Sequence, residues 1–162
     1  MADRPTVSDV PDAPRVRPGR RLGVDVGRAR IGVAVCDREG LLATPVETVA
    51  RDDDRDVPRI LEIAAEYDVL EIVVGLPISL SGNDTPSTQD ARDFAARIAE
   101  HVPVRMVDER LSTVSAQRGM RQAGRNTKQS RSVIDQAAAV IILQHALDRE
   151  RAGGGPPGSA LP

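Results

Sequence analysis

Hydrophobic and polar residues alternate along residues 22–36, LGVDVGRARIGVAVC. Because successive side chains of a strand point to opposite faces, this rhythm predicts strands over 21–26 and 30–36, joined by a short turn at 27–29. A further extended piece over 41–49 completes an antiparallel three-stranded meander.

Beyond the meander the spacing of apolar residues changes to that of helices alternating with strands. The run EIVVGL over 71–76 is almost entirely apolar, as is typical of a parallel strand buried on both faces. A second such strand is expected at 102–107. Helices are expected at 56–67, 87–100, 113–123 and 133–151.

The order βββαβαβαα predicts an α/β fold, in which a mixed five-stranded sheet of meander and parallel strands is flanked by helices. In such sheets ligands collect beyond the carboxyl ends of the parallel strands. The chain of 162 residues has the length of one domain, expected at 20–151. The segments 1–19 and 152–162 lack periodicity and are expected to be disordered tails.

Asp25 is the one acid in the first arm of the alternating segment. It shares a strand face with Gly23 and Gly27, which cannot cover it. An ionised carboxylate in a core-like strand is costly unless it is paired or hydrogen-bonded, so Asp25 indicates a metal ligand. The alternative is an acid on an edge strand that reaches water.

Acids also occur at the end of a predicted strand and at the start of a predicted helix. Asp108 and Glu109 end the strand over 102–107, and one of them is expected on the face of the helical layer or at its rim. The alternative is a solvated strand end with Arg110 as its salt-bridge partner. Asp135 begins a helix on a face of small apolar residues. Its alternative role is a capping box with Ser132.

Carboxylates of this kind suit Mg²⁺ or Mn²⁺, as one ion or as two. Two such ions can activate a water and stabilise the leaving oxygen of a phosphodiester. Cys36 is the only cysteine, so any metal must be held by oxygen ligands or by His101 and His145.

Basic residues gather in one stretch of a chain whose net charge is only −2. Between residues 110 and 133 there is no acid, which suits a polyanion such as a nucleic acid; the alternative is a solvated helix face. Tyr67 and Phe94 are the only aromatic residues, which disfavours modules that stack bases on aromatic platforms. The six basic residues are Arg110, Arg118, Arg121, Arg125, Lys128 and Arg131.

The hydropathy of the chain excludes a membrane protein. No apolar run approaches the roughly 20 residues that span a bilayer, and the N-terminus lacks the apolar stretch of a signal peptide. A cytoplasmic protein is therefore expected.

Four blocks of the chain resemble the YqgF/RuvX family, which is also called Holliday-junction-resolvase-like and has an RNase H-like fold. The blocks are LGVDVGRARIGVAVCD (22–37), VVGLPISLSG (73–82), VDERLSTVSA (107–116) and IDQAAAVIILQ (134–144).

The resemblance implies a catalytic and metal-binding triad of Asp25, Glu109 and Asp135, with Asp108 as the alternative to Glu109. It implies divalent-metal-dependent cleavage of structured RNA, namely maturation of the 5′ end of 16S rRNA on ribosomal precursor particles, by a monomer or a homodimer. The six basic residues would hold the nucleic acid.

The sequence also allows functions other than RNA cleavage. One is a Holliday-junction resolvase acting on structured DNA, which requires a symmetric dimer. Another is a non-catalytic RNA-binding factor in ribosome assembly or transcription. A phosphotransferase of the actin or sugar-kinase type is disfavoured, because the chain is too short and has no second Asp-x-Gly strand.

Overall fold

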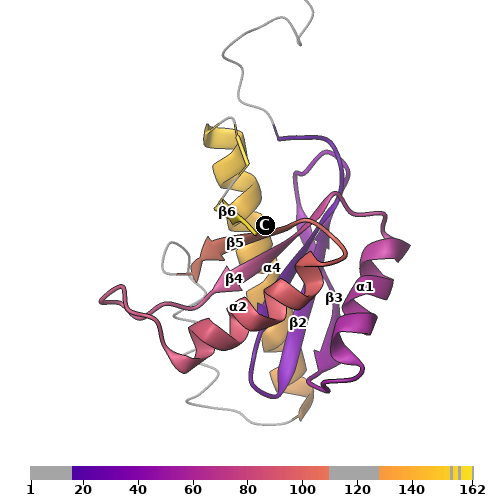
Figure 1. The fold of residues 1–162 in the computed structure, drawn as a ribbon. Coiled ribbons are helices and arrows are strands. Elements are labelled where there is room, and N and C mark those ends of the chain that lie inside the picture. Colours follow the sequence, from indigo (N-terminus) through magenta and orange to yellow (C-terminus); the bar gives the residue numbers. More distant parts are fainter. Residues whose placement is uncertain (1–15, 110–127, 154, 157, 162) are drawn as a thin grey trace, which may run out of the picture.

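The computed structural model describes residues 16–109, 128–153, 155–156 and 158–161, with the backbone alone for 128–132. Its strands form one sheet with helices on both faces (Figure 1). The elements are β1 (Arg21–Val26), β2 (Arg30–Cys36), β3 (Ala43–Ala50), α1 (Asp56–Glu66), β4 (Glu71–Leu76), α2 (Pro86–Ala99), β5 (Val104–Asp108), α4 (Lys128–Gly153) and β6 (Ser159–Ala160).

The sheet is mixed, as the sequence predicts. Its strand order is β3-β2-β1-β4-β5-β6. The first three strands pair in antiparallel fashion, whereas β4 runs parallel to β1 and β5 runs parallel to β4. The central position of β1 matters most, because it places Asp25 in the middle of the sheet and not on an edge.

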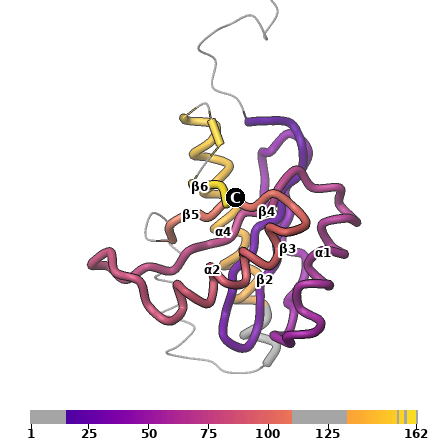
Figure 2. Tube along the Cα trace, in the orientation of Figure 1, coloured from indigo at the N-terminus to yellow at the C-terminus, as the bar shows by residue number. Residues whose placement is uncertain are grey.

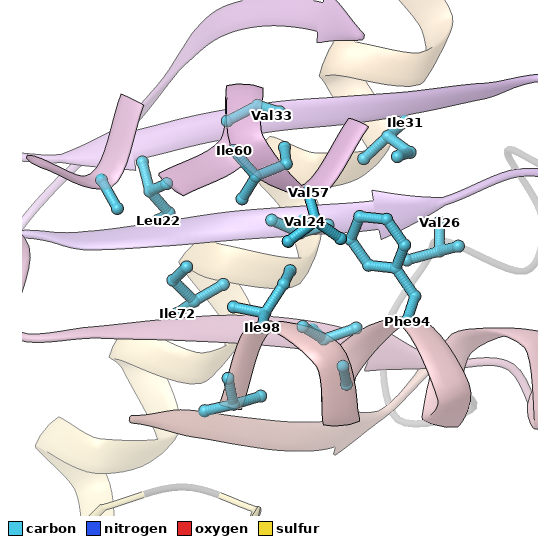
Figure 3. Packing of buried hydrophobic residues seen from close by; sticks show 14 of the residues in the cluster. Leu22, Val24, Val26, Ile31, Val33, Val57, Ile60, Ile72, Phe94 and Ile98 are labelled. Carbon is cyan, nitrogen blue, oxygen red and sulfur yellow. The ribbon is translucent and has the colours of Figure 1, made fainter. Parts of the chain in front are cut away.

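The two faces of the sheet are covered by different helices. On one face α1 and α2 pack against Leu22, Val24 and their neighbours, with Phe94 of α2 in the same cluster (Figure 3). On the other face lies α4, whose contacts include Ala34 and Val107. Figure 2 shows α4 running along the back of the sheet. Strand alternation therefore gives the odd positions of β1 to the α4 face.

The helices begin close to where the spacing of apolar residues predicts, except for the last one. Helix α2 is capped by Thr85 and Thr88, which exchange side-chain and backbone hydrogen bonds in a capping box. Helix α4 begins at Lys128, earlier than the predicted residue 133. Residues 128–132 contain no glycine or proline, so nothing in them stops a helix from extending toward the N-terminus.

The expected tails are partly ordered. Arg17 forms ion pairs with Glu71 and Glu150, and the Gly19 amide donates to the carbonyl of Arg38 at 2.8 Å. Residues 1–15 and the predicted helix over 113–123 lie outside the described residues. In the described ranges, no helix is both long enough and apolar enough to cross a membrane.

The C-terminal segment corrects the predicted number of strands from five to six. Ser159 and Ala160 form β6 and pair with Met106 and Arg105 of β5. The Leu161 amide continues this ladder by donating to the carbonyl of Val104 at 3.0 Å. Without β6 the outer edge of β5 would present unpaired backbone groups, which explains why this short segment is ordered.

Candidate active site

Asp25 lies on the α4 face of the central strand. Its neighbour on that face, Gly23, touches α4 so closely that a Cβ there would lie 2.6 Å from Cβ of Leu143. Asp25 is only 1% exposed. The alternative of a solvated edge acid is therefore wrong, and the carboxylate is buried on the α4 face of the sheet.

Asp135 is brought to Asp25 by the close approach of α4 to β2. Asp25 pairs with Gly32 across the β1–β2 ladder. A Cβ on Gly32 would lie 1.9 Å from the backbone carbonyl oxygen of Asp135, so only glycine allows the helix to pass there. Asp135 is 3% exposed. It lies inside α4 and not at its start, so the alternative of a capping box with Ser132 is wrong.

Glu109 approaches Asp25 from the other side. Val24 of β1 lies beside Val74 of β4, so Asp25 and Gly75 follow at adjacent positions of the two parallel strands. A Cβ on Gly75 would lie 2.6 Å from Oε1 of Glu109. The Glu109 carboxylate thus rests on the strand next to Asp25.

The same geometry distinguishes Glu109 from Asp108. Val107 packs on the α4 face whereas Met106 packs on the α1 and α2 face. Asp108 follows Met106 in alternation and lines a groove that also includes Leu161. Glu109, which is 3% exposed, is therefore the one of the two acids that lies on the same face as Asp25 and Asp135. We call Asp25, Glu109 and Asp135 the acidic site.

Arg30 belongs to this site although sequence reasoning missed it. Its Nε donates to Oδ2 of Asp135 at 2.7 Å. A signal was present, since Arg30 stands two residues before Gly32 and thus shares the face of Gly32 and Ala34. Following the alternation of the second strand back from Ala34 and Gly32 would have placed the Arg30 side chain on the same face as Asp25.

The acidic site offers the oxygen donors that a hard divalent cation prefers. Its three carboxylates come from different elements and are all buried, so the donor types suit such an ion. In the described part of the chain, however, no group of three or more His, Cys, Asp or Glu side chains is arranged to hold a metal. Oδ2 of Asp135 is bonded to Arg30 instead.

The predicted nucleic-acid-binding residues lie mostly beyond what the structure describes. Arg110, Arg118, Arg121 and Arg125 are outside the described residues. Lys128 and Arg131 are in the first turns of α4, ahead of Asp135 on the same helix. Their contribution to binding stays a prediction.

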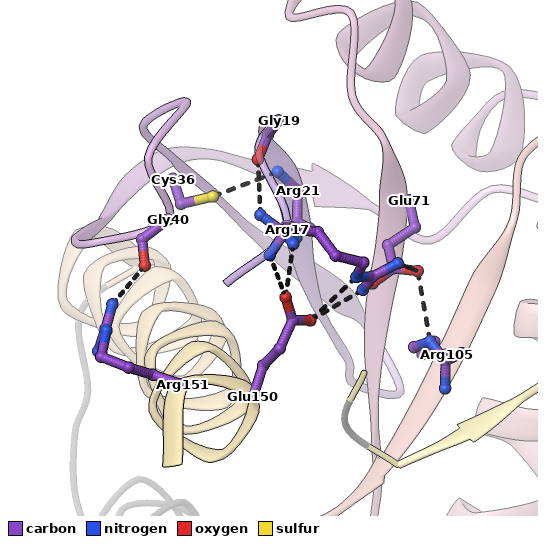
Figure 4. A network of polar contacts seen from close by, with 9 residues as sticks. All are labelled: Arg17, Gly19, Arg21, Cys36, Gly40, Glu71, Arg105, Glu150 and Arg151. Carbon is purple, nitrogen blue, oxygen red and sulfur yellow. Dashed lines mark hydrogen bonds and ion pairs between the residues drawn. The ribbon is translucent and has the colours of Figure 1, made fainter. Parts of the chain in front are cut away.

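A second charged cluster lies at the opposite end of the same strands (Figure 4). Glu150, near the end of α4, accepts from Nη2 of Arg21 at 2.9 Å, and both side chains are nearly inaccessible to solvent. Glu71, the first residue of β4, pairs with Arg17 and lies 3.4 Å from Nε of Arg105. We call these residues the arginine–glutamate network.

The network perturbs the ionisation of Glu150. Burial raises the pKa of this carboxyl group, but hydrogen bonds from the side chain and backbone of Arg17 and the charges of Arg21 and Arg17 outweigh the burial. The pKa of Glu150 therefore lies below its ordinary value.

Comparison with solved structures identifies the class of fold. The chain superposes on "T. thermophilus RuvC in complex with Holliday junction substrate" with a TM-score of 0.52 and 18% sequence identity, covering 85% of this chain and 98% of that chain. This likeness shows a RuvC-like, that is RNase H-like, fold.

Sequence comparison is more specific. The family described as "RuvX: Holliday junction resolvase" matches residues 19–149. A protein of Clavibacter sepedonicus named "Putative pre-16S rRNA nuclease" is 60% identical, covering 91% of this chain and 94% of its own length. A protein of the same name from Streptomyces coelicolor is 55% identical, with 95% of each chain covered. The chain belongs to the RuvX family.

Proposed function

We propose that this protein is a divalent-metal-dependent endonuclease that hydrolyses phosphodiester bonds of structured RNA, and that its substrate is the 5′ region of the 16S rRNA precursor. The observation that supports the proposal is that Asp25, Glu109 and Asp135 are all buried on the same face of the sheet. Relatives named as pre-16S rRNA nucleases support the choice of substrate. Such a protein would act on ribosomal precursor particles in the cytoplasm.

The acidic site has the composition that phosphodiester hydrolysis needs. Asp25, Glu109 and Asp135 would hold Mg²⁺ or Mn²⁺, which supplies activation of a water molecule and stabilisation of the leaving oxygen. The chain itself fixes the three carboxylates on a strand, a strand end and a helix. Carboxylates held on rigid elements keep their geometry between substrates, which favours precise cleavage.

The glycines around Asp25 have a direct role in this arrangement. Gly32 admits the backbone of α4, and Gly75 admits the carboxylate of Glu109. A side chain at either position would separate two of the acids. The site therefore depends on close backbone approach as much as on the acids themselves.

The six basic residues of 110–131 are proposed to hold the nucleic-acid backbone. Lys128 and Arg131 precede Asp135 along α4, so a phosphate chain bound there would run toward the acidic site. Their contacts would be electrostatic, and binding should weaken steeply with salt.

Cleavage of a pre-16S 5′ fragment by purified protein tests the proposal. Wild-type protein should cleave with Mn²⁺ or Mg²⁺ and stop when EDTA is added, and Asp25→Asn should be inactive. The matched control is Asp148→Asn, which changes an exposed acid on α4 and should keep the wild-type rate. Undiminished cleavage by Asp25→Asn would overturn the assignment. Chelator-insensitive RNA binding without cleavage would instead indicate a non-catalytic assembly factor.

The family description favours one second function, cleavage of four-way DNA junctions. A resolvase must cut two strands in concert, which requires a symmetric dimer. A competition assay offers the same protein a four-way junction and the RNA fragment, and its mass in solution is measured in parallel. The assay distinguishes RNA cleavage from junction cleavage. Preferential junction cleavage by a dimer would establish the second function.

A further inference from the structure

The Arg30–Asp135 ion pair places a cation at the rim of the acidic site. Nε of Arg30 lies 2.7 Å from Oδ2 of Asp135, and the carboxylate side chain is 4% exposed whereas the arginine is 27% exposed. The pair therefore joins a buried acid to a cation at the rim. A bond of this length between charged groups is a strong, charge-assisted hydrogen bond.

The pair forms on the sheet face that also carries the other two buried acids. Asp135 lies over Gly32, the ladder partner of Asp25, and Glu109 lies over the adjacent strand. Like charges at such positions disfavour one another, and their burial adds a desolvation cost. The guanidinium of Arg30 offsets part of this cost at Asp135.

A divalent cation at the acidic site would offset the same charges. It would also need the carboxylate oxygens as ligands, and Oδ2 of Asp135 is the oxygen that Arg30 holds. A guanidinium and a metal ion would therefore compete for one acceptor.

We propose that Arg30 is a built-in counter-ion of the acidic site: it neutralises Asp135 in the metal-free protein and is displaced from Oδ2 when the divalent cation binds. Arg30 thereby sets the metal concentration at which the site fills. The inference rests on the proposed function in one respect, namely that the cation binds at these carboxylates. It makes Arg30 a positioning residue for Asp135.

Calorimetric titration with Mn²⁺ alone tests this competition without using cleavage. Removing the competing cation should tighten binding, so Arg30→Gln should lower the Kd for Mn²⁺ by about three- to tenfold. Arg30→Lys keeps the charge and should stay within about twofold of wild type. In the Asp135→Asn background, the change Arg30→Gln should leave the Kd unaltered, because the shared acceptor is gone.

Arg59 provides a matched control elsewhere on the fold. Its Nε donates to Oε2 of Glu47 at 2.8 Å, which is the same kind of pair between α1 and β3. Arg59→Gln should leave the Kd for Mn²⁺ unchanged. An equal tightening in Arg59→Gln would mean that loss of any positive charge suffices, and it would overturn the role of Arg30.

Nuclear magnetic resonance on the wild-type protein follows the displacement directly. The Nε–H resonance of Arg30, assigned by its loss in Arg30→Lys, should shift on Mg²⁺ addition with the midpoint of a parallel calorimetric Mg²⁺ titration, while that of Arg59 stays in place. A static Arg30 resonance, or a Kd in Arg30→Gln equal to or above the wild-type Kd, would overturn the inference. These readouts are separate from the Asp25→Asn cleavage assay, so Arg30 can fail while the nuclease assignment stands.

Discussion

The two ends of the central strands both hold buried acids, and the acids are neutralised differently. At the amino ends of β1 and β4, Glu71 and Glu150 are held by arginines in the arginine–glutamate network. At the carboxyl ends, the acidic site has three buried acids, with Arg30 at the rim of one of them. Helix α4 reaches both ends, since Asp135 and Glu150 are separated by about 22 Å of helix.

The difference shows what a buried acid can indicate. Glu71 and Glu150 are as buried as the acids of the acidic site, yet their network ties the N-terminal segment, the sheet and α4 together. The acidic site lies instead where α/β sheets collect ligands, beyond the carboxyl ends of parallel strands. Position in the fold, and not burial alone, separates a structural from a functional carboxylate.

Neutralising Glu150 of the arginine–glutamate network should cause the largest loss of protein stability. In Glu150→Gln the guanidinium of Arg21, which is 1% exposed, loses its counter-charge. Breaking a buried pair in this way costs about 3 kcal/mol or more of unfolding free energy, measurable by urea denaturation. The control Asp148→Asn, at an exposed acid of the same helix, should leave the urea midpoint close to that of wild type. Equal midpoints for the two variants would contradict the structural role of the network.

At the other end of the strands, Gly32→Ala should disturb both stability and cleavage. Its Cβ would meet the carbonyl of Asp135 at 1.9 Å, so α4 must shift. Overpacking of this kind costs about 1–3 kcal/mol, and the displaced Asp135 should lower the cleavage rate as well. Gly153→Ala is the control, because a Cβ there meets nothing within 4 Å. Full activity in Gly32→Ala would mean that the position of Asp135 is unimportant.

The pH dependence of stability should be the smallest difference between the ends. The lowered pKa of Glu150 means that the unfolded chain takes up a proton before the folded chain does. Its stabilising contribution is therefore complete above the ordinary glutamate pKa of about 4.3 and is lost as the pH falls through the lower folded value. Urea midpoints measured from neutral pH to pH 3 should fall less steeply in Glu150→Gln. Parallel curves would contradict the shift.

Much of the fold followed from alternation and helical spacing. Asp25 was found because an acid interrupts an apolar strand, and Asp135 because it precedes a small-residue helix face. The alternation of side chains also distinguishes Glu109 from Asp108, but only once the register of β5 is known.

Other features required long-range contacts that a local pattern does not contain. Glu71 and Arg17 meet across 54 positions of the chain, and nothing near either residue signals the other. Strand β6 pairs with the open edge of β5. The glycine-rich sequence of residues 152–162 gives no sign of this pairing. The early start of α4 went unpredicted because residues 128–132 are polar and carry no apolar periodicity.

Cleavage by acid-to-amide variants at both ends of the strands tests the central claim most directly. Each variant is assayed on the pre-16S 5′ fragment with Mn²⁺, at a temperature where circular dichroism shows it folded. Asp25→Asn, Glu109→Gln and Asp135→Asn should each lose at least about 100-fold in rate. Glu71→Gln and Glu150→Gln should stay within about threefold of wild type. A wild-type rate in any variant of the acidic site, or equal losses at both ends, would contradict the account.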